Sequence, residues 1–195
     1  MAPARVGVLA LQGDVREHLR LLGQCGAEGR AVRLAAELQG LDGLVLPGGE
    51  STTMSRLILA FGLLQPLQEA VAGGMACLCT CAGTILAARQ VTDGLADQLK
   101  LGWLDIAVRR NAYGRQVQSG EADLEVAAVG PPPVRVAFIR APAIEAVGPE
   151  VEILARYREQ PCAVRQGRHL GLTFHPEITG DPRLHQLFLS GLERA

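Results

Sequence analysis

The chain has 195 residues, of which 48% are hydrophobic and 20% are charged, and its formal net charge is −1 at pH 7. These values are those of an ordinary globular protein that is long enough to bury a substantial core. Because the sequence contains no stripe of basic residues, a nucleic acid is not expected as a partner.

The N-terminal region gives no sign of a leader or a membrane anchor. The first apolar run, residues 6–11, is too short for a signal peptide or a membrane span. The number of cysteines is five, which is odd, and without a secretory context they are expected to be free thiols. We therefore expect a cytoplasmic protein that has no membrane partner.

The first half of the chain alternates strand-like and helix-like patterns. Continuous apolar runs at 6–11, 43–46 and 75–79 are typical of strands that are buried on both faces. We expect Asp14 to cap the helix that follows the first run, and Ser51 or Thr52 to begin the next. Further helices are predicted at 63–71 and 82–89. Repeated β-α units of this kind imply a parallel sheet with helices on both faces.

The second half contains short strand candidates with few helices between them. These candidates lie at 104–109, 122–127, 134–139, 151–155, 162–164 and 170–173, and a helix is expected at 181–192. No linker divides the chain, so residues 1–195 are expected to form one domain. We predict an α/β fold, a three-layer sandwich with a mostly parallel central sheet and an antiparallel extension.

Cys81 lies between a predicted strand and a predicted helix. Such a turn presents its central side chain at the carboxyl edge of a sheet, where the helix N-terminus favours a thiolate. The backbone N–H that follows can donate to an oxyanion. A buried core cysteine is the alternative interpretation. Cys77, Cys79 and Cys81 are spaced two residues apart, but this spacing is not typical of zinc sites, and we predict no metal.

His175 and Glu177 are candidates for a base and for the carboxylate that orients it. Residues two apart in an extended segment lie on the same side, and Pro176 favours that conformation. With Cys81 they would complete a Cys-His-Glu triad. His18, His169 and His185 compete for the role of base, but none has a carboxylate two residues away at a strand end.

Residues 47–51 form a glycine-containing loop after a strand. Its glycines allow a close approach of the backbone, and its N–H groups could supply a second oxyanion donor. The loop lacks the Gly-Lys-Ser/Thr ending of a phosphate-binding loop. An ordinary strand-to-helix connection with a serine cap is the alternative.

Taken together and in order, these motifs resemble those of class I (triad) glutamine amidotransferases. Within that group the chain is similar to the glutaminase subunits of pyridoxal phosphate synthase. The matching segments cover essentially the whole length: LALQG at 9–13 with REH at 16–18, LPGGESTT at 46–53, TCAG at 80–83, RNAYGRQ at 110–116, IRAP at 139–142, and FHPE at 174–177 with Asp181, Arg183 and His185.

The resemblance implies hydrolysis of glutamine through a thioester on Cys81, with His175 moving protons and Glu177 orienting His175. It places the oxyanion hole at Gly49 and Ala82. The glutamine-binding positions that it implies are Gly49, Glu50, Ser51, Arg110, Ile139 and Arg140. It implies no cofactor, and it implies that ammonia passes to a separate synthase subunit in a hetero-oligomer.

The chain departs from the family pattern at two positions. Cys79 replaces the usual first glycine of the nucleophile segment, which would cost strain if the backbone there had a positive φ. Tyr113 stands where the family tends to carry phenylalanine, which we interpret as a minor change. Two other functions remain open: an amidotransferase subunit of purine or histidine synthesis, and a non-catalytic regulatory partner.

Overall fold

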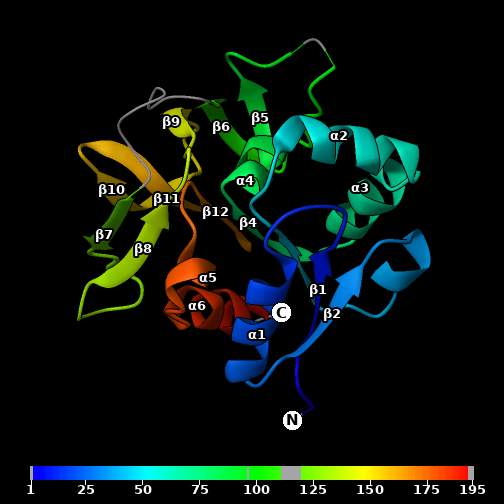
Figure 1. Cartoon of the computed structure of the whole chain (residues 1–195), viewed down its shortest axis with the longest axis horizontal. Helices are drawn as coiled ribbons and strands as arrows, with labels where there is room; N and C mark the ends of the chain where they lie inside the picture. Colours follow the sequence, from blue (N-terminus) through cyan, green and yellow to red (C-terminus); the bar gives the residue numbers. More distant parts are fainter. Residues whose placement is uncertain (1, 96, 111–119, 193–195) are drawn as a thin grey trace.

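The computed structural model describes residues 2–95, 97–110 and 120–192. Its centre is a seven-stranded sheet (Figure 1). The five neighbouring strands from β12 to β2 are parallel, and β10 and β11 extend them in antiparallel pairing. In spatial order the strands are β10 (Glu152–Tyr157), β11 (Gln160–Gln166), β12 (His169–Leu172), β4 (Ala76–Thr80), β3 (Gly43–Leu46), β1 (Arg5–Leu9) and β2 (Glu28–Val32).

Helices cover both faces of this sheet, which confirms the predicted three layers (Figure 1). Leu44 and Leu46 belong to the core under one layer, whereas Val45 belongs to the core under the other. Because successive side chains of a strand point to opposite faces, a strand between two cores is apolar throughout. One layer contains α2 (Ser51–Ala60), α3 (Leu64–Ala72) and α4 (Ala82–Ala87), and the other contains α1 (Val15–Gln24), α5 (Pro176–Thr179) and α6 (Arg183–Leu192).

Two smaller sheets complete the described part of the chain. One contains β5 (Ala88–Val91), β6 (Leu104–Arg109) and β9 (Ala143–Val147), and the other contains β7 (Gly120–Leu124) and β8 (Val134–Phe138). A short 3-10 helix, η1 (Ala35–Leu38), follows β2. Among the described helices, none is both long enough and apolar enough to cross a membrane.

Several predicted bounds need correction. The helix predicted at 82–89 ends at Ala87, and the chain continues as β5. The sequence did not indicate β2, β9 or α5. Most residues of β2 are exposed, so this strand lacks the apolar run that marked its neighbours.

The carboxyl ends of the parallel strands meet at one edge of the central sheet. β1, β3, β4 and β12 each lead at this edge into a segment that carries a motif from the sequence. In open α/β sheets such edges hold the ligand sites, because loops from separate strands converge there.

Candidate active site

Cys81 occupies a sharp turn between β4 and α4, as predicted. Its φ is 45°, a value that few residues other than glycine adopt. Its backbone N–H donates to the Leu172 carbonyl at 2.8 Å, which ties the turn to β12. Gly83 lets α4 pack closely, since a Cβ atom there would lie 2.1 Å from the Leu46 carbonyl oxygen. The strained conformation therefore holds the thiol at the sheet edge.

Cys79 does not bear the strain that its replacement of glycine suggested. It lies within β4, is fully buried in the core under α2, α3 and α4, and is not among the described residues with positive φ. Burial raises the pKa of its thiol, so Cys79 stays protonated. The residue is a core side chain and not a second nucleophile.

His175 and Glu177 are in direct contact. Nδ1 of His175 donates to Oε1 of Glu177 at 2.7 Å, and the Glu177 side chain is fully buried. The backbone of His175 is fixed by Ala137, whose carbonyl accepts from the His175 N–H at 2.8 Å. The prediction of an extended segment around Pro176 was wrong, because Pro176 begins α5 and the pair forms across the first turn of that helix.

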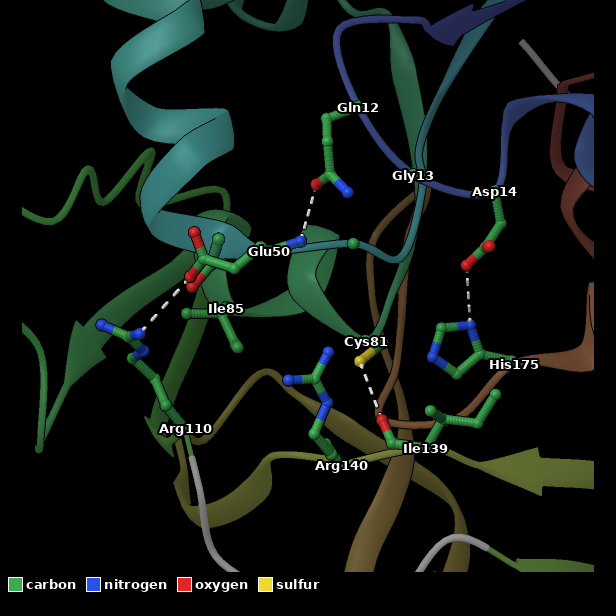
Figure 2. Close-up of a pocket in the computed structure, with 12 residues that line it drawn as sticks. Gln12, Gly13, Asp14, Glu50, Cys81, Ile85, Arg110, Ile139, Arg140 and His175 are labelled. Carbon is green, nitrogen blue, oxygen red and sulfur yellow. Dashed lines mark hydrogen bonds and ion pairs between the residues drawn. The ribbon is translucent and has the colours of Figure 1, made fainter.

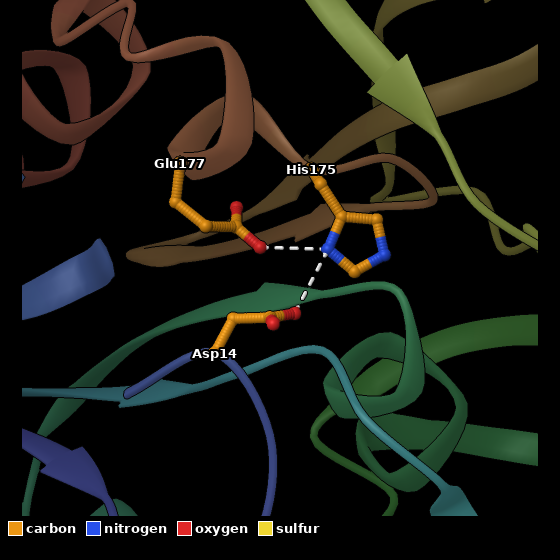
Figure 3. Close-up of side chains that lie close together, drawn as sticks. All are labelled: Asp14, His175 and Glu177. Carbon is orange, nitrogen blue, oxygen red and sulfur yellow. Dashed lines mark hydrogen bonds and ion pairs between the residues drawn. The ribbon is translucent and has the colours of Figure 1, made fainter. Parts of the chain in front are cut away.

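Asp14 is a second carboxylate on the same imidazole, and the sequence analysis missed it. It was expected to cap α1, but its side chain makes no capping hydrogen bond, and Oδ2 lies 3.3 Å from Nδ1 of His175 (Figure 3). Burial alone would lower the pKa of His175, yet hydrogen bonds to Asp14, Cys81 and Glu177 raise it to about 12. The position of Asp14 after β1 was the available signal, because β1 ends at the same sheet edge as β4.

Asp14, His175 and Glu177 also have the ligand types that hold metal ions, and the candidate atoms lie within 4.8 Å of one another. In the structure, however, Nδ1 of His175 donates a hydrogen bond to the Glu177 carboxylate, and the contacts with both carboxylates favour a protonated ring. The arrangement instead stabilises an imidazolium between two carboxylates.

The glycine loop packs directly against the base. A Cβ atom at Gly48 would lie 2.2 Å from Cε1 of His175, and one at Gly49 would lie 2.4 Å from Oε1 of Gln12. That same Gln12 oxygen accepts from the backbone N–H of Glu50 at 2.7 Å. A side chain at either position would displace His175 or Gln12, so the loop is packed against the site and is not an ordinary connection.

Helix α2 begins at Ser51, as predicted, and its cap is Glu50 and not the serine of the alternative interpretation. The Glu50 carboxylate accepts the backbone N–H groups of Thr52 and Thr53 at 3.1 and 2.6 Å. Burial opposes ionisation, but these hydrogen bonds lower the pKa of Glu50 to about 2. A permanent negative charge therefore lies at the end of the glycine loop.

A cavity of about 320 Å³ joins these parts (Figure 2). Figure 2 shows the Cys81 sulfur and the His175 ring on the same side of this space, and Sγ of Cys81 lies 3.8 Å from the Ile139 carbonyl oxygen. Glu177 lies behind His175 and does not line the cavity. The predicted site residues on its wall are Gly49, Glu50, Ser51, Cys81, Arg110, Ile139, Arg140 and His175, and the wall also includes Gln12, Gly13, Asp14 and Ile85.

Arg110 closes one end of the cavity. Its guanidinium donates to Oε1 of Gln98 at 3.2 Å and lies 3.7 Å from the Glu50 carboxylate. Arg140 presents a second guanidinium to the same space, from a residue with φ of 46° (Figure 2). The rest of the motif that begins at Arg110, including Tyr113, lies outside the described residues.

Comparisons with known proteins agree with this arrangement. A family model described as the SNO glutamine amidotransferase family matches residues 8–194. The chain is 57% identical over 192 residues to pyridoxal 5'-phosphate synthase subunit PdxT of Frankia casuarinae, with 98% of this chain and 96% of that protein covered. It is 54% identical over 195 residues to the protein of the same name from Mycolicibacterium vanbaalenii, with 98% and 100% covered.

Solved structures give the same result for the fold. A crystal structure described as a glutamine amidotransferase superposes with a TM-score of 0.90 at 46% identity, covering 96% of this chain and 98% of that one. A putative GMP synthase protein from Thermoplasma acidophilum has a TM-score of 0.70 at 17% identity, with 100% and 96% covered. The second likeness concerns the fold alone. The predicted fold class is confirmed.

Proposed function

The chain belongs to the SNO glutamine amidotransferase family, and from this membership we propose that it hydrolyses L-glutamine as the glutaminase subunit of a pyridoxal 5'-phosphate synthase. Relatives that are 52–57% identical to this chain, over nearly their full length, have the name of that subunit. The products are L-glutamate and ammonia. Residues 1–195 act as one glutaminase domain.

One observation carries the assignment of the catalytic residues. A cysteine at a strained strand-to-helix turn shares a cavity with a histidine whose other ring nitrogen is held by a buried glutamate. Because Nδ1 of His175 is bonded to Glu177, Nε2 is the nitrogen that is left for Cys81 and for the substrate. This is the arrangement of a nucleophile, a base and an orienting carboxylate.

In the first step, Sγ of Cys81 attacks the carboxamide carbon of glutamine. The C–N bond breaks, and His175 donates a proton to the departing nitrogen, so that ammonia leaves and a thioester remains. Water then attacks the thioester while His175 accepts its proton. The C–S bond breaks, glutamate leaves, and the Cys81 thiolate is restored. Glu177 holds the His175 ring in place through both steps.

The oxyanion of each tetrahedral intermediate is assigned to the N–H groups of Ala82 and Gly49. Ala82 is the first residue of α4, so its N–H lies at the positive end of that helix. Removal of one such donor typically lowers kcat by a factor of about 100 to 1,000.

The charged residues of the cavity fit the backbone groups of an amino-acid substrate. The guanidinium groups of Arg110 and Arg140 are suited to the α-carboxylate, because a guanidinium binds a carboxylate through paired hydrogen bonds. The ionised Glu50 is suited to the α-ammonium group. Gly49, Ser51 and Ile139 complete the proposed glutamine site.

The ammonia is passed to a separate synthase subunit, with which the chain forms a hetero-oligomer. The names of the relatives support this partner, and they favour pyridoxal phosphate synthesis over purine or histidine synthesis. A cytoplasmic location and the absence of nucleic-acid and membrane partners remain predictions from the sequence.

The test is glutamate release from glutamine, measured for this chain alone and mixed with a pyridoxal phosphate synthase subunit. Stimulation by the synthase subunit is expected. A rate of glutamate release that the synthase subunit does not change would assign the enzyme to another amidotransferase pathway. An absence of hydrolysis in a folded, assembled complex would contradict the proposed activity and favour a non-catalytic regulatory role.

A further inference from the structure

Two buried histidines lie behind the triad, and the proposed reaction does not use them. His18 on α1 and His185 on α6 are both 0% exposed, and neither lines the cavity. They cannot replace His175 as the base, because no substrate atom in the cavity reaches them. Their helices lie on the same face of the sheet as α5, which carries Glu177 (Figure 1).

The two imidazoles form a chain that leads to the triad carboxylate. Nε2 of His185 lies 2.9 Å from Nδ1 of His18. Nε2 of His18 lies 3.2 Å from Oγ1 of Thr80 and 3.6 Å from Oε1 of Glu177, the oxygen that accepts from His175. Thr80 directly precedes Cys81, so His18 contacts both the Glu177 carboxylate and the turn that carries the nucleophile.

His18 and His185 are both neutral. Burial, with the nearby charges of His185 and His175, lowers the pKa of His18 well below its usual range, and burial lowers the pKa of His185 to about 4. Each ring therefore carries one proton, and only one proton lies between Nδ1 of His18 and Nε2 of His185.

The position of that proton follows from the neighbours of the two rings. If His18 donated to His185, the bare Nε2 of His18 would face the Glu177 carboxylate. The proton of His185 would then be on Nδ1, which has no partner in the described structure and would be a buried unpaired N–H group. If His185 donates to His18, a His18 N–H group faces the carboxylate, and the unpaired atom is only an acceptor. The second arrangement is favoured, because buried unpaired N–H groups are rare and a lone pair repels a carboxylate.

We propose that His18 and His185 are positioning residues of the triad: His185 donates from Nε2 to His18, which fixes the tautomer of His18 and directs its Nε2–H at Glu177 and Thr80. This proposal rests on the glutaminase function proposed above. The two rings act through Glu177 and touch neither the substrate nor the reacting atoms.

Glu177 needs such support because water cannot reach it. Its Oε2 has no hydrogen-bond partner in the described structure, and burial raises its pKa. The groups that face it are the His175 ring, the backbone N–H of Glu177 itself, the more distant Asp14 carboxylate and the His18 N–H. Arg20 on α1 bonds only the Glu177 backbone carbonyl, at 3.5 Å. An oriented N–H dipole from His18 helps to keep Glu177 ionised, and an ionised Glu177 stabilises the protonated His175.

The first test needs no substrate. The ¹⁵N shifts of the imidazole nitrogens in the 20.7 kDa chain distinguish the tautomers directly. The proposal expects protons on Nε2 of His18 and on Nε2 of His185 at pH 7, and protons on both nitrogens of His175. A proton on Nδ1 of His18 would overturn it. A failure of the proposed glutaminase function would abolish hydrolysis and leave these shifts unchanged.

The second test uses a matched pair of variants, His185→Leu and His185→Gln, each assayed for glutamate release with the synthase subunit. The leucine side chain has no donor, whereas the glutamine amide can still donate to His18. His185→Leu is expected to lower kcat about tenfold with KM within twofold, and to move the alkaline limb of the kcat/KM profile to lower pH. His185→Gln is expected to restore most of both.

A purely structural role gives a different result. Folded His185→Leu with a lower Tm but wild-type kcat and pH profile would overturn the proposal, and so would His185→Gln that is as impaired as His185→Leu. His18→Phe removes both nitrogens at a buried position and is expected to have the larger defect. If His18→Phe does not fold, the two His185 variants and the ¹⁵N shifts still decide the question.

Discussion

Substitution of Gly48 by alanine tests the packing of the glycine loop on the catalytic base. A Cβ atom there would lie 2.2 Å from Cε1 of His175, whereas ordinary van der Waals contact begins at 3.4 Å, so the ring or the loop must move by about 1.2 Å. Misplacement of a catalytic group by about 1 Å can cost about a hundredfold in rate. We therefore expect Gly48→Ala to lower kcat about a hundredfold and to leave KM nearly unchanged.

The assay is glutamate release at saturating glutamine, with wild-type protein and variant each assembled with the synthase subunit. Gly191→Ala in α6 is the matched control, because a Cβ atom there meets nothing within 4 Å. The control is expected to keep wild-type kcat and a Tm close to that of the wild type, since Gly191 is the next-to-last residue of α6 and has open space around it. A folded, assembled Gly48→Ala with kcat within twofold of wild type would refute the packing of the loop on His175.

Four further substitutions have defined expectations. Glu177→Gln should lower kcat and move the alkaline limb of the kcat/KM profile to lower pH. Hydrogen bonds to carboxylates help to raise the pKa of His175, and the protonated ring must donate to the leaving ammonia. An unchanged limb would contradict this role of Glu177. Asp14→Asn should also move this limb to lower pH, because the Asp14 carboxylate lies 3.3 Å from Nδ1 of His175 and helps to raise the pKa of the ring. An unchanged limb would contradict this role. Arg110→Lys should raise KM for glutamine with little change in kcat, and an unchanged KM in steady-state assays would remove Arg110 from the glutamine site. Cys79→Gly should keep activity but lower Tm. Glycine within a strand lowers the free energy of unfolding by about 0.5–1 kcal/mol, and the lost side chain leaves a gap in the core. A higher Tm by calorimetry would show that Cys79 is strained.

The sequence predicted the elements whose signal is local. The strand at 43–46 has the observed bounds of β3, because its four residues are buried on both faces and are apolar throughout. The turn at Cys81 was predicted from the change between an apolar run and a helical pattern. The exposed strand β2 was missed, since its composition does not distinguish it from a loop.

The site was predictable where a motif fixes the backbone and not where distant side chains meet. Asp14 has the sequence signature of a helix cap, and only the fold reveals that its carboxylate turns to His175 instead. Helix α2 begins at Ser51 as predicted, but the residue that caps it is Glu50 and not a serine. The contact between His18 and His185 joins residues that are 167 positions apart, a separation at which no local pattern indicates contact.

The central claim is that Cys81 is the nucleophile that attacks glutamine. Its most direct test is labelling by 6-diazo-5-oxo-norleucine, a glutamine analogue with an electrophilic carbon, followed by peptide mass spectrometry of the protein assembled with the synthase subunit. We expect one adduct per chain, on Cys81, and none on the buried Cys77 or Cys79. An adduct on another cysteine, or no adduct in a folded and assembled complex, would contradict the assignment.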